Sequence, residues 1–167
     1  MPGGRMATAF LRINEASLVL LILTILFSIG NWLGFDLRST HALTGLLATV
    51  VGMFGLVAIM FFVMATGGYM KESLKGDSLE KDFIKRIAGI KMRLYPWCIL
   101  EISLLIATAV AGGGLLAGAP VYWYHLGLAV ATIGVYLKTI SATKIDFAEN
   151  RVMLEAVYKK AGKKSSL

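Results

Sequence analysis

The chain contains 167 residues, of which 57% are hydrophobic and only 16% are charged. Its mean hydropathy is +0.72. Because a water-soluble domain carries about 25% charged residues, this composition excludes an ordinary soluble protein and indicates a chain that resides in lipid. Cys98 is the only cysteine, so no disulfide can form within one copy and no cysteine-based metal motif is available.

The apolar residues fall into four long blocks, in the ranges 17–35, 41–66, 94–117 and 120–140. Each block has about 19 to 26 residues, and at a rise of about 1.5 Å per residue a helix of that length crosses a hydrocarbon layer of about 30 Å. We therefore predict four transmembrane helices. The short connections after the first and third blocks favour antiparallel neighbours.

Basic residues lie mainly on one side of the predicted membrane. Arg5 and Arg12 precede the first block, while other Lys and Arg residues gather in 71–93 and again from Lys144 onward. By the positive-inside rule, we expect both termini and the range 69–93 in the cytoplasm of an inner or plasma membrane. The net charge of +7 then reflects the lipid surface, and we predict no nucleic-acid partner.

Helical patterns continue beyond two of the apolar blocks. The second block runs on to Gly76, a residue that favours helix ends, and the capping sequence that begins at Asp77 restarts a helix. The range 69–93 is thus predicted to be a cytoplasmic helical hairpin, and 141–161 a cytoplasmic extension of the last helix. The fold class is all-α: one domain, 1–167, forming an up-down-up-down four-helix bundle whose helices 2, 3 and 4 extend into the cytoplasm. No internal repeat is evident.

Both histidines stand at the start of predicted helices on the same side of the membrane. His41 heads the second helix and a stripe of small residues, and His125 heads the fourth helix and a line of polar residues. In this bundle those helices are diagonal partners, so the two imidazoles can act as the axial ligands of a haem b. The alternative is that both are interfacial polar residues without a ligand. The stripe below His41 comprises Gly45, Ala48, Gly52 and Gly55; the line below His125 comprises Thr132, Tyr136, Thr139 and Thr143.

A second candidate site is a carboxyl group inside the third apolar block. Glu101 lies about 8 Å beyond Pro96 at a rise of about 1.5 Å per residue, and an ionisable group at that depth is costly unless it is paired. Lys138 on the fourth helix is the expected partner in a buried ion pair, with Tyr136 as an alternative hydrogen-bond donor. A proton relay or a contact with a quinone headgroup is the functional alternative. Farther along, Asp146, Glu149 and Asn150 are expected to form a solvated face.

Two functions remain open from the sequence. The first is a non-catalytic subunit that docks other membrane subunits, or further copies of itself, through small-residue helix faces and basic cytoplasmic helices. The second is an electron-transfer protein that holds one haem b between His41 and His125, with a link to quinone. We find no nucleophile beside a base and no metal-ligand motif other than the two candidate haem ligands, so the sequence predicts no catalytic activity of its own.

Overall fold

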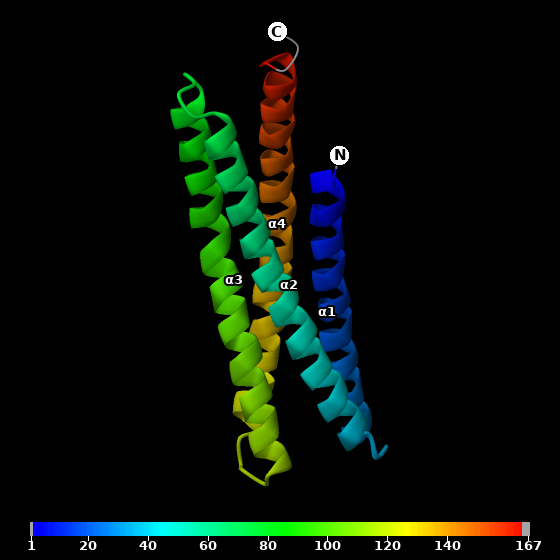
Figure 1. Ribbon diagram of the computed structural model, residues 1–167. Helices are drawn as coiled ribbons and strands as arrows, with labels where there is room; N and C mark the ends of the chain where they lie inside the picture. The colour runs from blue at the N-terminus through cyan, green and yellow to red at the C-terminus, as the bar shows by residue number, and fades with distance from the viewer. Residues whose placement is uncertain (1, 165–167) are drawn as a thin grey trace.

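The computed structural model describes residues 2–164, which form four α-helices (Figure 1). They are α1 (Pro2–Trp32), α2 (Arg38–Ser73), α3 (Glu80–Leu116) and α4 (Tyr122–Lys164). All four are long and apolar enough to cross a membrane. The prediction of an all-α protein with four such helices is confirmed, and the helices support a multi-pass membrane protein.

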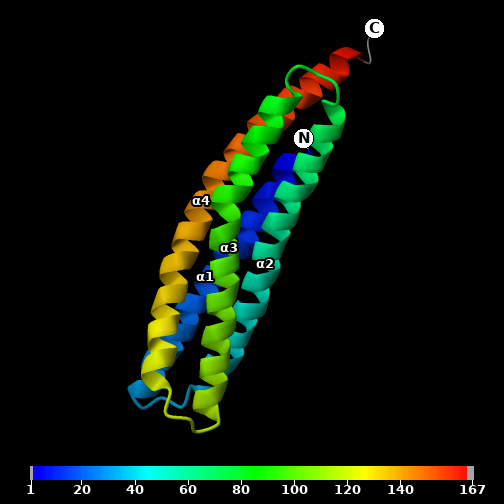
Figure 2. The ribbon, with the colours of Figure 1, turned by 90° about the vertical axis from the view of Figure 1, so that its left-hand side faces the viewer.

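The four helices lie alongside one another in a long, narrow bundle (Figures 1 and 2). The α1–α2 and α3–α4 connections lie at one end, which we call the histidine end because His41 and His125 are there. The α2–α3 connection and the last turns of α4 lie at the opposite end, which we call the basic end. In the described chain α1 packs chiefly on α2, and α3 on α4; α2 and α4 meet across the bundle, whereas α1 and α3 do not touch.

The two hairpins repeat the same turn geometry. Each turn contains a glycine with a positive φ angle, +97° at Gly34 and +87° at Gly118. In the first turn the amide of Phe35 donates to the carbonyl of Gly30 at 3.1 Å, and in the second the amide of Ala119 donates to a carbonyl in the same relative position at 2.9 Å. Because L side chains are disfavoured at such φ angles, glycine is required at both turns.

This geometry corrects the expectation that the chain has no internal repeat. The sequences of the two hairpins align with an offset of 84 residues. The hydrogen-bonded residues Thr66 and Asn150 are separated by the same 84 residues, so they occupy equivalent positions. The ranges 20–41 and 104–125 share the pattern L-L-I-x-T, two spaced glycines and a final histidine. Few positions are identical, and most are common membrane residues, so the repeat becomes evident only when its turns and contacts are compared.

Small residues of α2 allow α1 to approach closely. A Cβ atom added at Gly52 would lie 2.7 Å from Ser17 Oγ, and one added at Gly55 would lie 2.7 Å from Asn14 Nδ2. Both distances are below van der Waals contact, so the glycines make space for polar side chains of α1. Ser17 uses this space to donate a hydrogen bond to the carbonyl of Ala48 at 2.9 Å. The close approach of α1 to α2 thus allows a hydrogen bond between the two helices, as expected for helices in lipid.

Ion pairs and hydrogen bonds tie α4 to its neighbours toward the basic end. Arg93 donates to Asp146 at 2.6 Å and to Glu149 at 2.7 Å, while Asn150 donates to Thr66 at 3.0 Å. Asp146 and Asn150 are almost fully buried, so the expectation of a solvated face at these two residues is wrong. The reason is that α3 and α2 extend alongside this part of α4 and supply partners for its polar side chains.

We predict that Gly52→Ala destabilises the bundle and that Gly68→Ala does not. The new methyl group at position 52 would collide with Ser17 and also lie 3.1 Å from Leu105, whereas nothing lies within 4 Å of a Cβ at Gly68. Overpacking of this kind costs about 1–3 kcal/mol. Thermal unfolding in detergent measures the effect, and equal melting temperatures for the two variants would contradict the packing described at Gly52.

Candidate functional site

The structure brings the two histidines of the chain together at the histidine end. His41 lies in the first turn of α2 and His125 in the first turn of α4. Their ring centroids are 6.0 Å apart and their ring planes are 84° apart. Both side chains are partly buried. The two predicted haem ligands are thus in contact across the line where α2 meets α4, at equivalent positions of the two hairpins.

Each histidine ring is held by a backbone carbonyl of the preceding helix. His41 Nδ1 lies 2.8 Å from the carbonyl oxygen of Thr24, and His125 Nδ1 lies 3.1 Å from that of Thr108. A carbonyl only accepts hydrogen bonds, so Nδ1 carries the proton in both rings and Nε2 of each neutral imidazole retains its lone pair. This arrangement is typical of metal-bound histidines, whose second nitrogen donates to a carbonyl or carboxylate that orients the ring.

A cavity of about 510 Å³ lies between α1 and α4 at the histidine end. It is lined by the last turns of α1 and the first turn of α4, one helical turn from Thr24 and from His125. On the other side, a Cβ added at Gly112 would lie 3.0 Å from His125 Cε1, so glycine leaves room for the ring there. The volume is within the range of about 300–1,000 Å³ that is usual for small-molecule sites. The lining residues are Ser28, Asn31, Trp32, Tyr122 and Trp123.

A buried line of polar side chains runs along α4 from the histidine pair toward the basic end. Thr108, whose carbonyl holds His125, also places its hydroxyl 2.9 Å from that of Thr132. From there the polar positions of α4 recur every three or four residues, so they occupy one helix face. Every member is at most 2% exposed. We call this line the polar seam; its members are Thr132, Tyr136, Thr139, Thr143, Asp146 and Asn150.

Tyr136 and Glu101 lie in the interior of the bundle and differ in their partners. The hydroxyl of Tyr136 donates to Asn14 Oδ1 at 3.0 Å. Glu101 is fully buried, and neither of its carboxyl oxygens has a hydrogen-bond partner among the described residues. Lys138 does not reach it: its Nζ atom lies 5.9 Å from the centre of the Trp97 ring. Two residues after the buried Tyr136, Lys138 is on the opposite, exposed side of α4, where it cannot pair with a group in the core.

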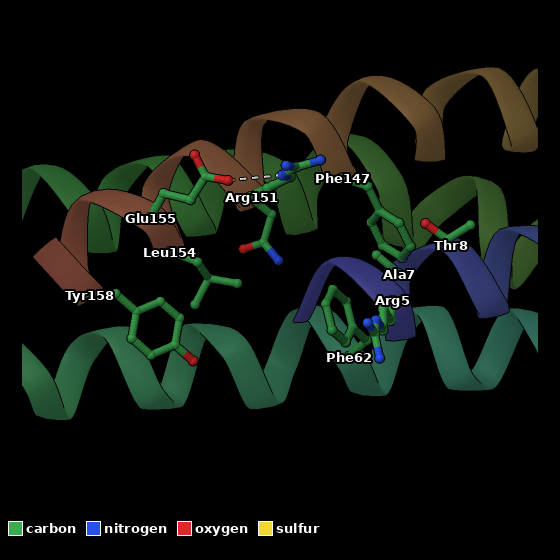
Figure 3. A pocket seen from close by; sticks show the side chains of 10 residues that line it. Arg5, Ala7, Thr8, Phe62, Phe147, Arg151, Leu154, Glu155 and Tyr158 are labelled. Carbon is green, nitrogen blue, oxygen red and sulfur yellow. Dashed lines mark hydrogen bonds and ion pairs between the residues drawn. The ribbon is translucent and has the colours of Figure 1, made fainter. Parts of the chain in front are cut away.

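A second cavity, of about 570 Å³, lies between α1, α2 and α4 toward the basic end (Figure 3). Its lining joins apolar side chains with two arginines, one of which, Arg151, pairs with Glu155 at 2.9 Å. Sequence analysis did not predict this cavity, because three helices distant in sequence form it and no local pattern marks it. The lining includes Arg5, Ala7, Thr8, Phe62, Phe147, Leu154 and Tyr158.

The structure thus joins some of the predicted site residues and separates others. His41 contacts His125, Tyr136 bonds to α1, and Glu101 and Lys138 remain apart. Comparisons with protein-family models, with curated proteins and with solved structures find no match to this chain.

We predict that Tyr136→Phe lowers the free energy of unfolding by about 0.5–1.5 kcal/mol, the usual net contribution of one hydrogen bond. The change removes only the hydroxyl group that donates to Asn14. Tyr124→Phe is the matched control, because Tyr124 is 76% exposed on the same helix and should leave stability unchanged. Denaturant or thermal melts in one detergent compare the two. Equal stability of both variants would show that the buried hydrogen bond contributes nothing.

Proposed function

We propose that this protein is a membrane electron-transfer protein that binds one haem b between His41 and His125. The observation that carries the proposal is the contact of two imidazoles whose Nδ1 atoms are both bonded to backbone carbonyls. Two histidines held in this way on facing helices provide the two axial nitrogen ligands that a six-coordinate haem iron requires. The haem would supply the redox centre, and the chain would supply its binding and orientation.

The spacing of the rings supports a metal ion between them. Imidazole nitrogens bind a metal such as zinc at about 2.0–2.1 Å, which sets the centres of two opposed rings about 6 Å apart. The observed separation is 6.0 Å. Axial ligation does not restrict the angle between the two ring planes, so the near-perpendicular arrangement agrees with it. The carbonyls of Thr24 and Thr108 would fix both rings with hydrogen on Nδ1, which leaves Nε2 as the nitrogen that can coordinate.

The surroundings of the pair fit a flat, mostly apolar group. The cavity on the α1–α4 side offers Trp32, Tyr122 and Trp123 as apolar, aromatic walls. On the α3 side, Gly112 leaves room for the His125 ring, because a Cβ there would lie 3.0 Å from Cε1 of that ring. Arg38, in the first turn of α2, would provide a positive charge at the same end for an acidic substituent of the ligand.

The proposal includes an orientation in the membrane. We place the chain up-down-up-down across the bilayer, with both termini and the range 69–93 in the cytoplasm and the histidine pair near the opposite surface. The concentration of Lys and Arg residues outside the short connections after α1 and α3 supports this orientation. An inner or plasma membrane is the expected location, and quinone is the expected class of redox partner within the lipid.

The proposal predicts that the purified protein gives a reduced-minus-oxidised haem spectrum, either as isolated or after addition of haem. His41→Ala and His125→Ala should each abolish the six-coordinate spectrum, because each removes one axial ligand. Imidazole added to either variant should restore it by occupying the space of the lost ring. Absorption spectroscopy in detergent measures all three effects.

Thermal melting of the same samples provides the control for folding. Both alanine variants should remain folded without haem, and each should melt somewhat below the wild type because it loses one hydrogen bond and one partly buried ring. A wild-type protein that remains colourless with added haem would contradict the proposal. So would variants that both keep the wild-type spectrum.

A second candidate function, that of a subunit docking other membrane proteins, is favoured by one observation. Gly127, Ala131 and Gly134 form an exposed stripe on α4, and a Cβ at either glycine would meet nothing within 4 Å. Small residues at such spacing let another helix approach closely in lipid. The occupant would be a helix of another subunit or of a second copy of the chain.

For this second function we predict that Gly134→Leu reduces association with the neighbouring chain. The larger side chain would hold an approaching helix away from the stripe. Val130→Leu is the control, because Val130 is 62% exposed and already carries a branched side chain. Chemical cross-linking in native membranes, followed by separation by mass, measures association. Equal cross-linking in wild type and Gly134→Leu would exclude docking through this stripe.

A further inference from the structure

We propose that Glu101 is a proton-binding carboxyl group in the core of the bundle and that it exchanges its proton with water at the basic end along the polar seam of α4. This function is separate from haem binding and does not require it. The inference starts from one feature: Glu101 is fully buried, and both of its carboxyl oxygens lack a hydrogen-bond partner among the described residues. A group in that position is functional by default in a membrane protein.

Among the residues that the structure describes, no positively charged side chain pairs with Glu101 and would hold it as an anion. On its own helix the nearest titratable group is the thiol of Cys98, and on α4 it is the hydroxyl of Tyr136; both are close enough to sense a charge at Glu101. The buried polar groups of α1 in the core, Asn14 and Ser17, are neutral, and α2 contributes the glycine stripe. An isolated carboxylate in such a place costs several kcal/mol, so the neutral, protonated acid is the stable form.

The repeat of the two hairpins supports the same protonation state. The residue equivalent to Glu101 in the first hairpin is Ser17, given the offset of 84 residues seen between Thr66 and Asn150. Ser17 donates its hydroxyl hydrogen to the carbonyl of Ala48. Of the two forms of a glutamate side chain, only the protonated one has an O–H group that can donate. In its protonated form Glu101 would carry an O–H group at the position where the first hairpin has the hydroxyl group of Ser17.

The polar seam provides a route from this level of the bundle to the basic end. From Thr132 to Asn150 the seam extends about 27 Å at 1.5 Å per residue, so it passes from the apolar part of α4 into the predicted cytoplasmic extension. Its far end joins charged and polar partners: Asp146 binds Arg93, and Asn150 binds Thr66. Each member of the seam is buried. Because the hydroxyls of Thr132, Thr139 and Thr143 each donate to a backbone carbonyl of α4, a proton would move along the seam through water molecules between its members.

The exchange itself is a simple acid–base step. The O–H bond of the Glu101 carboxyl group breaks, and the proton forms a new O–H bond on a water molecule that enters the seam from the basic end. The carboxylate persists until a proton returns by the reverse path. No electron moves, and water is the only co-reactant.

Infrared spectroscopy of the full-length protein in lipid tests the protonation state. The wild type should show a carbonyl band of a protonated carboxylic acid at neutral pH, and the band should shift when H₂O is replaced by D₂O. Glu101→Gln should lose this band while retaining the size and shape of the side chain. Glu155→Gln, which alters the carboxylate paired with Arg151 near the surface, is the matched control and should keep it.

Two further variants test the route. Thr143→Val replaces a fully buried seam hydroxyl with a methyl group and should slow the D₂O shift, whereas Ser141→Ala removes an exposed hydroxyl of the same helix and should not. A band that survives in Glu101→Gln, or that fails to shift in D₂O, would overturn the proposal. Equal exchange rates in Thr143→Val and Ser141→Ala would overturn the seam as the route. Because these measurements need no haem, they are independent of the spectrum proposed for the histidine pair.

Discussion

The structure depends on one constraint: in a bundle of apolar helices, each polar side chain must find its partner inside the protein, because lipid offers none. Helix α4 carries most of the buried polar groups, and its neighbours supply the partners. Asn14 of α1 accepts from Tyr136, Thr66 of α2 accepts from Asn150, and Arg93 of α3 pairs with Asp146. The position of α4 therefore follows from its polar face as much as from its apolar one.

The approximate two-fold repeat explains why the histidine pair forms where α2 meets α4. Equivalent positions of α2 and α4 face each other across the line where these helices meet, which brings His41 onto His125 and Thr66 onto Asn150. The hairpins have also diverged. Gly52 of α2 corresponds to Tyr136 of α4, and the tyrosine hydroxyl lies 3.3 Å from the Cβ position at Gly52. A small residue in one half thus accommodates a large one in the other.

A local pattern predicted that the two histidines are close, but it could not predict that Glu101 lacks a partner. The two helices that carry the histidines are diagonal neighbours, so residues in their first turns lie at the same level of the bundle. The position of each histidine along its helix was therefore sufficient to predict that the two rings are close. The assignment of Lys138 as the partner of Glu101 used depth alone. It failed because helical rotation places Lys138 two residues from Tyr136, on the outward face, where it lies over Trp97.

Composition and periodicity alone determined that this chain has four long apolar helices, because helix length and hydropathy are local properties. They also identified the polar line below His125. Only the tertiary structure decided how the helices pack and which side chains they pair. It shows that Asp146 and Asn150 are buried, that the hairpins repeat, and that Glu101 lacks a partner among the described residues. Each of these depends on the rotation and contact of helices distant in sequence, and side-chain partners across such contacts have no signature within a single helix.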